Sequence, residues 1–201
     1  MDYDVIIVGA GPGGIFAAYE LKKQRPELKV AIFEAGYALE KRRCPIDGVK
    51  VKSCIGCRTC SIMSGFGGAG AFSDGKYNIT NDFGGTLYEH IGRKQAIDLM
   101  RYVDEINMSH GGEGTKLYST TGTDLKKKCM QNKLKLLDAS VRHLGTDINL
   151  VVLGRVYDEL KEQVDFYFES PVTSIETVEG GYDVLVGEKR YTCRNSIASV
   201  G

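Results

Sequence analysis

The chain of 201 residues has no excess of charge of either sign, because 26 lysine and arginine residues balance 26 aspartate and glutamate residues. A balanced charge provides no general attraction to nucleic acid or to anionic lipid. The basic run Lys126–Lys128 is interpreted as the solvated face of a helix. We therefore expect no nucleic-acid partner and no membrane partner.

The sequence also lacks an apolar run long enough to cross a bilayer. Its N-terminus enters an apolar strand almost at once, so no export signal is expected. These absences predict a cytoplasmic protein. In that compartment the six cysteines are interpreted as ligands or redox groups before structural disulfides.

What the sequence does contain is a G-x-G-x-x-G pattern directly after Val5–Val8, a short β-branched run that predicts a buried parallel strand. In this pattern Gly9 permits a tight turn and Gly11 lets a pyrophosphate approach the backbone. Gly14 lets the following helix pack closely on the strand. That helix, expected over residues 13–24, would direct its N-terminal N–H groups at the phosphate.

A second predicted strand, Lys29–Phe33, ends at Glu34, which lies 20 residues after Gly14. At this distance a carboxylate accepts hydrogen bonds from ribose hydroxyls. Its charge would repel a 2′-phosphate, so the pattern predicts FAD or NAD(H) rather than NADP(H). Because strand, turn, helix and acid occur together, a dinucleotide site is favoured over a glycine-rich turn without a ligand.

Two pairs of basic residues leave their roles open. Arg42 and Arg43 follow the second strand and could reach back to a pyrophosphate, or be ordinary surface charge. Arg142 and His143 precede a predicted helix and could meet a substrate carbonyl or a phosphate, or belong to a capping turn.

Residues 44–76 combine much glycine with little periodicity, so no regular structure is expected there. Cys44, Cys54, Cys57 and Cys60 follow the spacing C-x9-C-x2-C-x2-C, and the triplet resembles that of bacterial ferredoxins. The spacing is compatible with an iron–sulfur cluster, with zinc, or with unmetallated thiols that are redox-active or buried. In ferredoxins, however, the Cys-Pro pair follows the triplet, whereas here it precedes the triplet.

The glycine-rich segment after these cysteines, Ser64–Lys76, is predicted to contact a cofactor. Its small residues allow the backbone to approach something flat or charged. Phe66 and Phe72 would be costly to expose and would pack such a loop down. The competing interpretation is a flexible loop.

The remaining segments predict an α/β fold. An amphipathic helix is expected at Arg93–Asn107, and a strand at Lys133–His143. Asp165–Ser170 would return the chain to the sheet as a strand. Short strands separated by glycine turns then predict an antiparallel meander at residues 172–178, 182–186 and 190–193. Ser196–Gly201 would begin a further buried strand, and we expect the natural protein to continue beyond it.

These blocks resemble the glutathione-reductase-like superfamily of flavoproteins with two dinucleotide-binding domains, and specifically a bacterial family of uncharacterised FAD-dependent dehydrogenases. The resemblance rests on DVIIVGAGPGG, KRRCP, the cysteine triplet, GFGGAGAFSDGK, VRHLGTD and the closing strand. It implies a Rossmann-like FAD-binding domain over residues 1–201, with a parallel sheet, helices on its faces and a small antiparallel β-meander. It also implies that the fold is incomplete at the C-terminus, without its substrate domain and C-terminal FAD segment.

The resemblance implies FAD in an extended conformation, with the ADP half on the first glycine loop, the adenine near Val172, and the 65–76 loop by the flavin or ribityl chain. The expected cofactor-binding residues are Gly9, Ala10, Gly11, Pro12, Gly13, Gly14, Glu34, Ala35, Arg42, Arg43, Gly67, Gly68, Ala69, Gly70, Phe72, Ser73, Asp74, Val172 and Gly201. The candidate metal ligands are Cys44, Cys54, Cys57 and Cys60.

The leading functional hypothesis is an FAD-dependent oxidoreductase, with the cysteines as an electron relay if they hold an iron–sulfur cluster. Its partner would be a small-molecule substrate or an electron donor such as NAD(P)H, and no catalytic residue is assigned. One alternative is a flavin-dependent enzyme that modifies tRNA or another macromolecule through thiol nucleophiles, although the balanced charge counts against it. Another is a non-catalytic, truncated redox or metal-binding module.

Overall fold

The computed structural model describes residues 1–200, which divide into two compact units. The first unit comprises residues 1–72 together with the segment from Val156 onward, and the second comprises Ser73–Arg155. That the whole chain is one dinucleotide-binding domain stays a prediction. Helix α5 (Gly145–Leu160) begins in the second unit and ends in the first.

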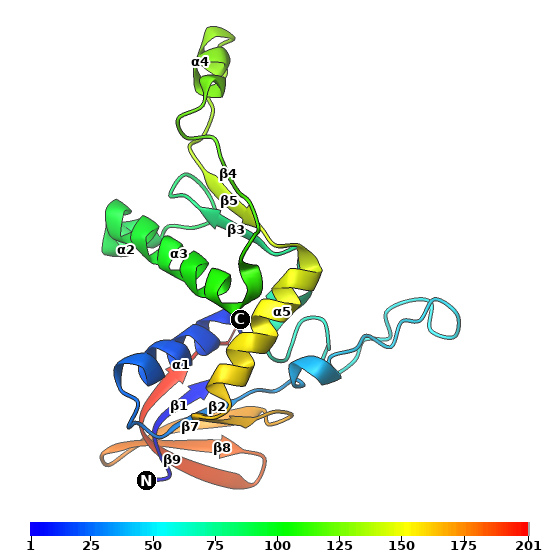
Figure 1. The fold of residues 1–201 in the computed structure, drawn as a ribbon. Helices are drawn as coiled ribbons and strands as arrows, with labels where there is room; N and C mark the ends of the chain where they lie inside the picture. The colour runs from blue at the N-terminus through cyan, green and yellow to red at the C-terminus, as the bar shows by residue number, and fades with distance from the viewer. Residues whose placement is uncertain (201) are drawn as a thin grey trace. The chain divides into compact units, whose positions relative to one another are not determined.

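The first unit is built on a six-stranded sheet with the order β6-β2-β1-β9-β8-β7. Strands β6, β2, β1 and β9 are parallel neighbours, and β8 and β7 continue the sheet in the antiparallel direction. Figure 1 shows helix α1 (Pro12–Gln24) connecting β1 to β2. The predicted α/β fold with a mostly parallel sheet is thus confirmed. The strands are β1 (Tyr3–Val8), β2 (Val30–Phe33), β6 (Val164–Tyr167), β7 (Val172–Val178), β8 (Gly181–Val186) and β9 (Lys189–Ala198).

Two neighbouring parallel strands, β1 and β2, end side by side at one edge of the sheet. β1 and β2 are almost wholly buried and apolar, as parallel strands covered on both faces must be. Their register pairs Val8 with Phe33, and the N–H of Gly9 donates to the carbonyl of Phe33 at 2.7 Å. The residues that follow the two strands, Gly9 and Glu34, therefore lie close together.

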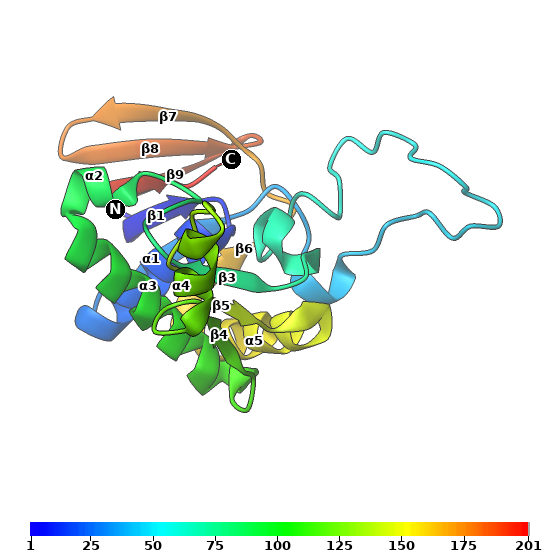
Figure 2. The ribbon, with the colours of Figure 1, turned by 90° about the horizontal axis from the view of Figure 1, so that it is seen from above.

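The meander differs from its prediction at the third strand. Two segments, 190–193 and Ser196–Gly201, are expected from the sequence, but residues 189–198 form the single strand β9. β9 pairs antiparallel with β8 and parallel with β1, so the meander extends the main sheet, as Figure 2 shows. The polar residues after Cys193 interrupt the apolar pattern without interrupting the strand, because the ladder to β1 continues through them to Ala198.

The second unit contains a three-stranded antiparallel sheet with the order β3-β5-β4. The amphipathic helix predicted at Arg93–Asn107 is confirmed as α3. Within residues 1–200, no helix combines the length and apolar character of a membrane span. The other elements of this unit are β3 (Lys76–Ile79), α2 (Leu87–Ile91), a π-helical turn (Met108–Gly112), β4 (Leu117–Ser119), α4 (Asp124–Gln131) and β5 (Ser140–His143).

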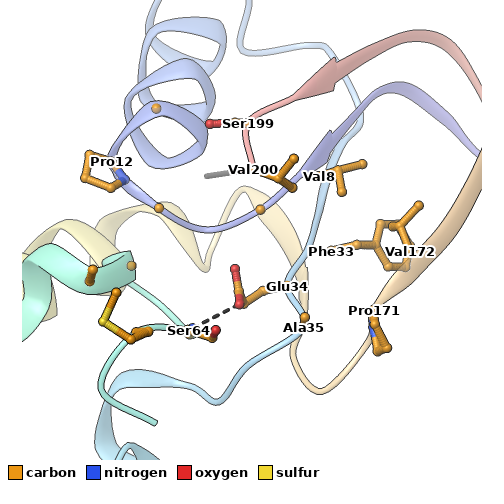
Figure 3. Close-up of a pocket in the computed structure, with 17 residues that line it drawn as sticks. Val8, Pro12, Phe33, Glu34, Ala35, Ser64, Pro171, Val172, Ser199 and Val200 are labelled. Carbon is orange, nitrogen blue, oxygen red and sulfur yellow. Dashed lines mark hydrogen bonds between the residues drawn. The ribbon is translucent and has the colours of Figure 1, made fainter. Parts of the chain in front are cut away.

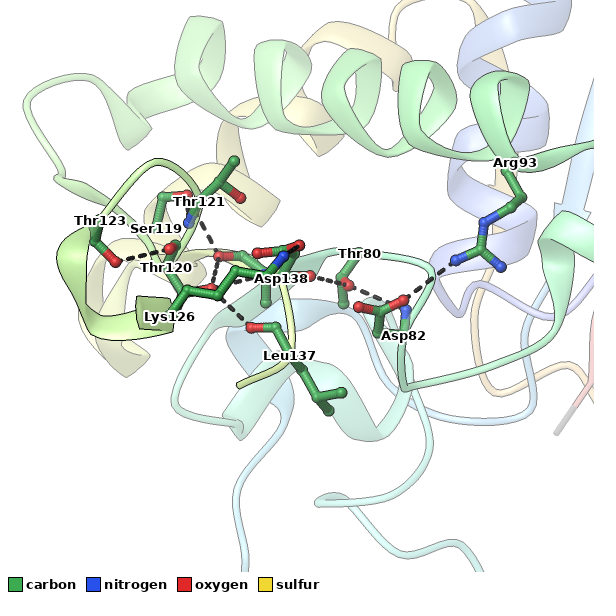
Figure 4. A network of polar contacts seen from close by, with 11 residues as sticks. Thr80, Asp82, Arg93, Ser119, Thr120, Thr121, Thr123, Lys126, Leu137 and Asp138 are labelled. Atoms are coloured by element: carbon green, nitrogen blue, oxygen red, sulfur yellow. Dashed lines mark hydrogen bonds and ion pairs between the residues drawn. The ribbon is translucent and has the colours of Figure 1, made fainter. Parts of the chain in front are cut away.

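The strand predicted at Lys133–His143 is confirmed only for its last four residues, β5. Figure 4 shows how side chains hold the preceding segment. The Thr120 hydroxyl donates to the carbonyl of Leu137, and the Thr80 hydroxyl donates to the carbonyl of Asp138, both at 2.8 Å. Side-chain hydroxyl groups thus hold these two carbonyls just before the strand, which begins at Ser140.

The Arg142 side chain is paired with Asp104 in the interior of the second unit. Its Nε donates to Oδ1 of Asp104 at 2.9 Å and its Nη2 donates to Oδ2 at 2.7 Å. Both side chains are nearly buried, with 12% and 11% of their surface exposed. This two-pronged pairing raises the pKa of Arg142. This buried ion pair is a role that the sequence analysis did not consider for Arg142.

Candidate functional site

A pocket of about 710 Å³ lies in the first unit, where β1, β2 and β9 end (Figure 3). Its walls come from the first glycine loop, the end of β2, the segment around residues 63–69 and the start of β7. In an open parallel sheet, ligands bind at the carboxyl ends of the strands. The lining residues are Val8, Gly9, Gly11, Pro12, Gly13, Phe33, Glu34, Ala35, Met63, Ser64, Gly65, Gly68, Ala69, Pro171, Val172, Ser199 and Val200.

The glycines of the first loop meet different surroundings. Gly9 has a φ of +100°, and a side chain there would overlap the carbonyl oxygen of Ser199 at the end of β9. A Cβ on Gly13 would lie 2.5 Å from the Ser199 hydroxyl. Gly11 is different, because a Cβ there would meet no atom within 4 Å. The absence of a side chain at Gly9 and Gly13 lets the end of β9 approach the loop, whereas Gly11 borders the open pocket.

The N-terminus of α1 is left open toward this pocket. The helix begins at Pro12, and its N-cap residue, Gly11, provides no side-chain hydrogen bond. The first turn contains no acidic residue. Since first-turn N–H groups have no partner within a helix, this end can receive an anion at the positive pole of the helix dipole.

Glu34 is 7% exposed, and its carboxylate is already engaged by the backbone. Oε2 accepts a hydrogen bond from the N–H of Ala10 at 2.7 Å. Oε1 accepts from the N–H groups of Gly36 at 2.7 Å and Gly65 at 2.9 Å. A carboxylate offers about four acceptor positions, so one on Oε2 remains for a ligand hydroxyl. The sequence pattern predicts only the ribose contact and does not reveal this second role.

The glycine-rich segment after the cysteines packs against the first loop. The N–H of Gly67 donates to the carbonyl of Ala10 at 2.8 Å. Phe66 is fully buried, with ring centroids 5.0 Å from Tyr157 and 5.9 Å from Phe166. The expectation that Phe66 packs this segment down is therefore confirmed. Aromatic packing of this kind explains why so much glycine does not make the segment a free loop.

Arg42 and Arg43 have different environments. Arg43 is exposed. Arg42 is 3% exposed, and its guanidinium group donates four hydrogen bonds to backbone carbonyls of residues 61–68. Burial lowers the pKa of Arg42, and the negative charge of Glu34 opposes this shift. Arg42 is thus occupied inside the protein, and it does not line the pocket.

The predicted cofactor-binding residues fall into four groups. Those that line the pocket are Gly9, Gly11, Pro12, Gly13, Glu34, Ala35, Gly68, Ala69 and Val172. Those of the first unit that do not line it are Ala10, Gly14, Arg42, Arg43, Gly67, Gly70 and Phe72. Ser73 and Asp74 belong to the second unit. Gly201 lies outside the described residues.

Sequence reasoning missed much of the apolar wall. Val8 and Phe33 are the last residues of β1 and β2, and Pro171 precedes β7. Ser199 and Val200 follow β9. A usable signal exists for four of these residues, because the last residue of each parallel strand and the residues just after it lie where ligands bind in such sheets.

The four clustered cysteines are not arranged as metal ligands. Cys44, Cys54 and Cys57 are exposed and Cys60 is partly exposed. Within residues 1–200, no group of three or more His, Cys, Asp or Glu side chains is placed to hold a metal ion. The residues as placed do not fit an iron–sulfur cluster or a zinc ion, and neither interpretation gains support from the structure.

Thiol reactivity provides a test of this arrangement. In the native protein we expect a maleimide to label Cys44, Cys54 and Cys57 rapidly, and Cys193 only after unfolding. Cys193 is fully buried, and burial raises its pKa, so less of it is the reactive thiolate at neutral pH. Peptide mass spectrometry after timed labelling measures this order. If the three exposed thiols become reactive only after treatment with a chelator, they are metal ligands and the open arrangement is wrong.

Comparison with known proteins finds similarity at two scales. The Thi4 family model matches residues 1–40. Thiamine thiazole synthase of Yarrowia lipolytica is 63% identical over 35 residues, which are 17% of this chain and 11% of that protein. An uncharacterized protein of Clostridium beijerinckii is 24% identical over 199 residues, which are 98% of this chain and 30% of that protein. The residues matched by the family model include the β1-α1-β2 segment, which carries the dinucleotide pattern.

Among solved structures, glycine oxidase from Geobacillus kaustophilus is similar to the chain, with a TM-score of 0.53 and 18% sequence identity. The match covers 99% of this chain and 55% of the oxidase chain. The chain therefore has the fold of the FAD-binding oxidoreductases and spans about half the length of this example.

Proposed function

We propose that the chain supplies the dinucleotide-binding part of an FAD-dependent oxidoreductase. The observation that carries this proposal is the pocket at the ends of β1, β2 and β9, bordered by Gly11 and Glu34. It combines an uncapped helix end for phosphate, a carboxylate for ribose and apolar walls for a base. The fold comparison supports a flavoprotein, because the chain shares its architecture with an oxidase over almost its whole length.

The residues present fit the ADP half of FAD. Gly11 leaves open space where a side chain would stand, and the N-terminus of α1 would receive the pyrophosphate. The free acceptor position on Oε2 of Glu34 would take a ribose hydroxyl. Phe33, Pro171 and Val172 would flank the adenine with apolar surface. FAD, when bound, supplies hydride or electron transfer at its flavin ring.

The chain's binding partners stay predictions. We expect a small-molecule substrate or an electron donor such as NAD(P)H, and no nucleic acid, because acidic and basic residues are balanced. Whether the four cysteines serve as redox-active thiols stays a prediction.

Replacement of Gly11 by alanine tests the proposal. The methyl group would stand in empty space, and Gly11 has φ −74° and ψ 179°, which alanine adopts without strain. The free energy of unfolding is therefore expected to change by less than about 1 kcal/mol. The same methyl group would crowd a bound pyrophosphate, so the affinity for FAD is expected to fall about 10- to 100-fold.

Gly154→Ala is the matched control, because Gly154 also has no atom within 4 Å of an added Cβ and does not line the pocket. Titration of each full-length variant with FAD, followed by flavin fluorescence, provides the affinities. Equal affinities for the Gly11→Ala and Gly154→Ala proteins would place the dinucleotide elsewhere.

A further inference from the structure

The Arg42 guanidinium group binds four backbone carbonyls from one short segment. Its Nε donates to Ser61 at 2.8 Å and its Nη2 donates to Ile62 at 2.7 Å. Its Nη1 donates to Phe66 at 2.7 Å and to Gly68 at 2.8 Å. A guanidinium group has five N–H donors, and four hydrogen bonds from it bind four carbonyls of the 61–68 segment to a single cation.

The chemistry of this contact requires arginine rather than a positive charge alone. A guanidinium group is a planar fork with fixed donor directions, whereas a lysine ammonium is a compact charge with three donors. The ring of Phe72 lies over the Arg42 guanidinium, with its centroid 4.8 Å from Cζ, which stabilises the same flat orientation. A lysine at this position could not reach all four carbonyls.

A second buried charge, the Glu34 carboxylate, binds a backbone N–H group of the same segment. The carboxylate of Glu34 accepts the N–H of Gly65 at 2.9 Å, one residue before a carbonyl that Arg42 binds. Gly65 has a φ of +114°, and a Cβ there would lie 2.5 Å from the carbonyl oxygen of Tyr37 and 2.7 Å from Cδ of Arg42. Thus an anion and a cation bind two nearby peptide groups of one segment, and Gly65 is placed where an added side chain would meet Arg42.

The 61–68 segment, which Arg42 and Glu34 bind, forms a wall of the pocket. Met63, Ser64, Gly65 and Gly68 all line it. A Cβ on Gly68 would lie 3.2 Å from Cα of Gly11, so this wall stands directly against the first glycine loop. Loss of the four Arg42 hydrogen bonds would release the carbonyls to solvent and allow the wall to move.

We propose that Arg42 is the positioning residue of the dinucleotide site, which fixes the 61–68 segment as a wall of the pocket without touching the ligand itself. The proposal rests on the function proposed above. It differs from the pyrophosphate contact that the sequence leaves open, since a contact made through charge would be retained in part by lysine.

The test uses full-length protein carrying Arg42→Lys or Arg42→Ala, with Arg58→Ala as the control. Arg58 is an exposed arginine in the same connection. Hydrogen exchange without ligand is expected to become about tenfold faster or more in peptides covering residues 61–68 of both Arg42 variants, with β1 and β2 peptides unchanged. The affinity for FAD is expected to fall about tenfold or more in both, and methylguanidinium is expected to restore it in Arg42→Ala.

The possible results distinguish failure of the role proposed for Arg42 from failure of the proposed FAD binding. Wild-type exchange and affinity in Arg42→Lys would overturn the inference, because charge alone would then suffice. Lost affinity with unchanged exchange would also overturn it and would indicate a direct ligand contact. If the wild-type protein binds no FAD, the proposed function fails, while the exchange measurement still decides whether Arg42 orders the segment. Unchanged β1 and β2 peptides establish that each variant is folded.

Discussion

Replacing Gly14 with alanine is expected to destabilise the first unit by about 3 kcal/mol or more. A methyl group at this position would overlap the carbonyl oxygen of Gly9 and would lie 3.2 Å from Cγ2 of Ile7. The overlapped atom belongs to the backbone, so no side-chain rotation relieves it. Helix α1 would have to move away from β1, which would disturb the centre of the sheet.

Chemical denaturation of the full-length protein measures this loss. Because the free energy of unfolding of a domain is about 5–15 kcal/mol, the midpoint should move clearly to lower denaturant. Gly154→Ala provides the control, since an alanine there meets no neighbour within 4 Å. A Gly14→Ala protein as stable as this control would show that α1 does not pack on the loop as described.

The second large effect is expected from Glu34→Gln. An amide has one oxygen and one NH₂ group, so it cannot accept hydrogen bonds at both ends as the carboxylate does. If its oxygen keeps Gly36 and Gly65, its NH₂ group faces the N–H of Ala10, and the reverse orientation leaves two donors unpaired. We expect a loss of about 2–4 kcal/mol in the free energy of unfolding.

The same substitution should weaken FAD binding, because it disturbs the two loops that line the pocket and removes the charge near the ribose. Denaturation and FAD titration are compared with Glu40→Gln, in which an exposed acid in the same connection is changed. If Glu34→Gln loses affinity but keeps full stability, Glu34 serves the ligand alone, and its backbone contacts are unimportant.

The parts of the fold that sequence predicts well are those encoded by neighbouring residues. β1, α1 and β2 form one local unit in which an apolar run, a glycine pattern and a terminal acid occur at fixed distances. These features indicate Gly9, Gly11 and Glu34 without knowledge of the rest of the chain. Phe66 was also predictable, because a buried aromatic residue is the simplest way to hold down a glycine-rich segment.

The parts that sequence does not predict depend on contacts between distant segments. Arg42 binds carbonyls some 19 to 26 residues away, and backbone carbonyls leave no trace in side-chain pattern. β9 was divided in the prediction because its polar residues break the apolar run, although pairing with β1 keeps it extended. The cysteine spacing showed which thiols could bind one metal site. Spacing alone does not bring those thiols together in space.

The central claim is that a dinucleotide lies over Gly11 at the ends of β1 and β2. Calorimetric titration of the full-length protein with FAD, run in parallel on Gly11→Ala, tests it most directly. We predict one FAD per wild-type chain and an affinity about 10- to 100-fold lower in the variant. Absence of binding to the wild-type protein, or equal affinity in both proteins, would contradict the claim.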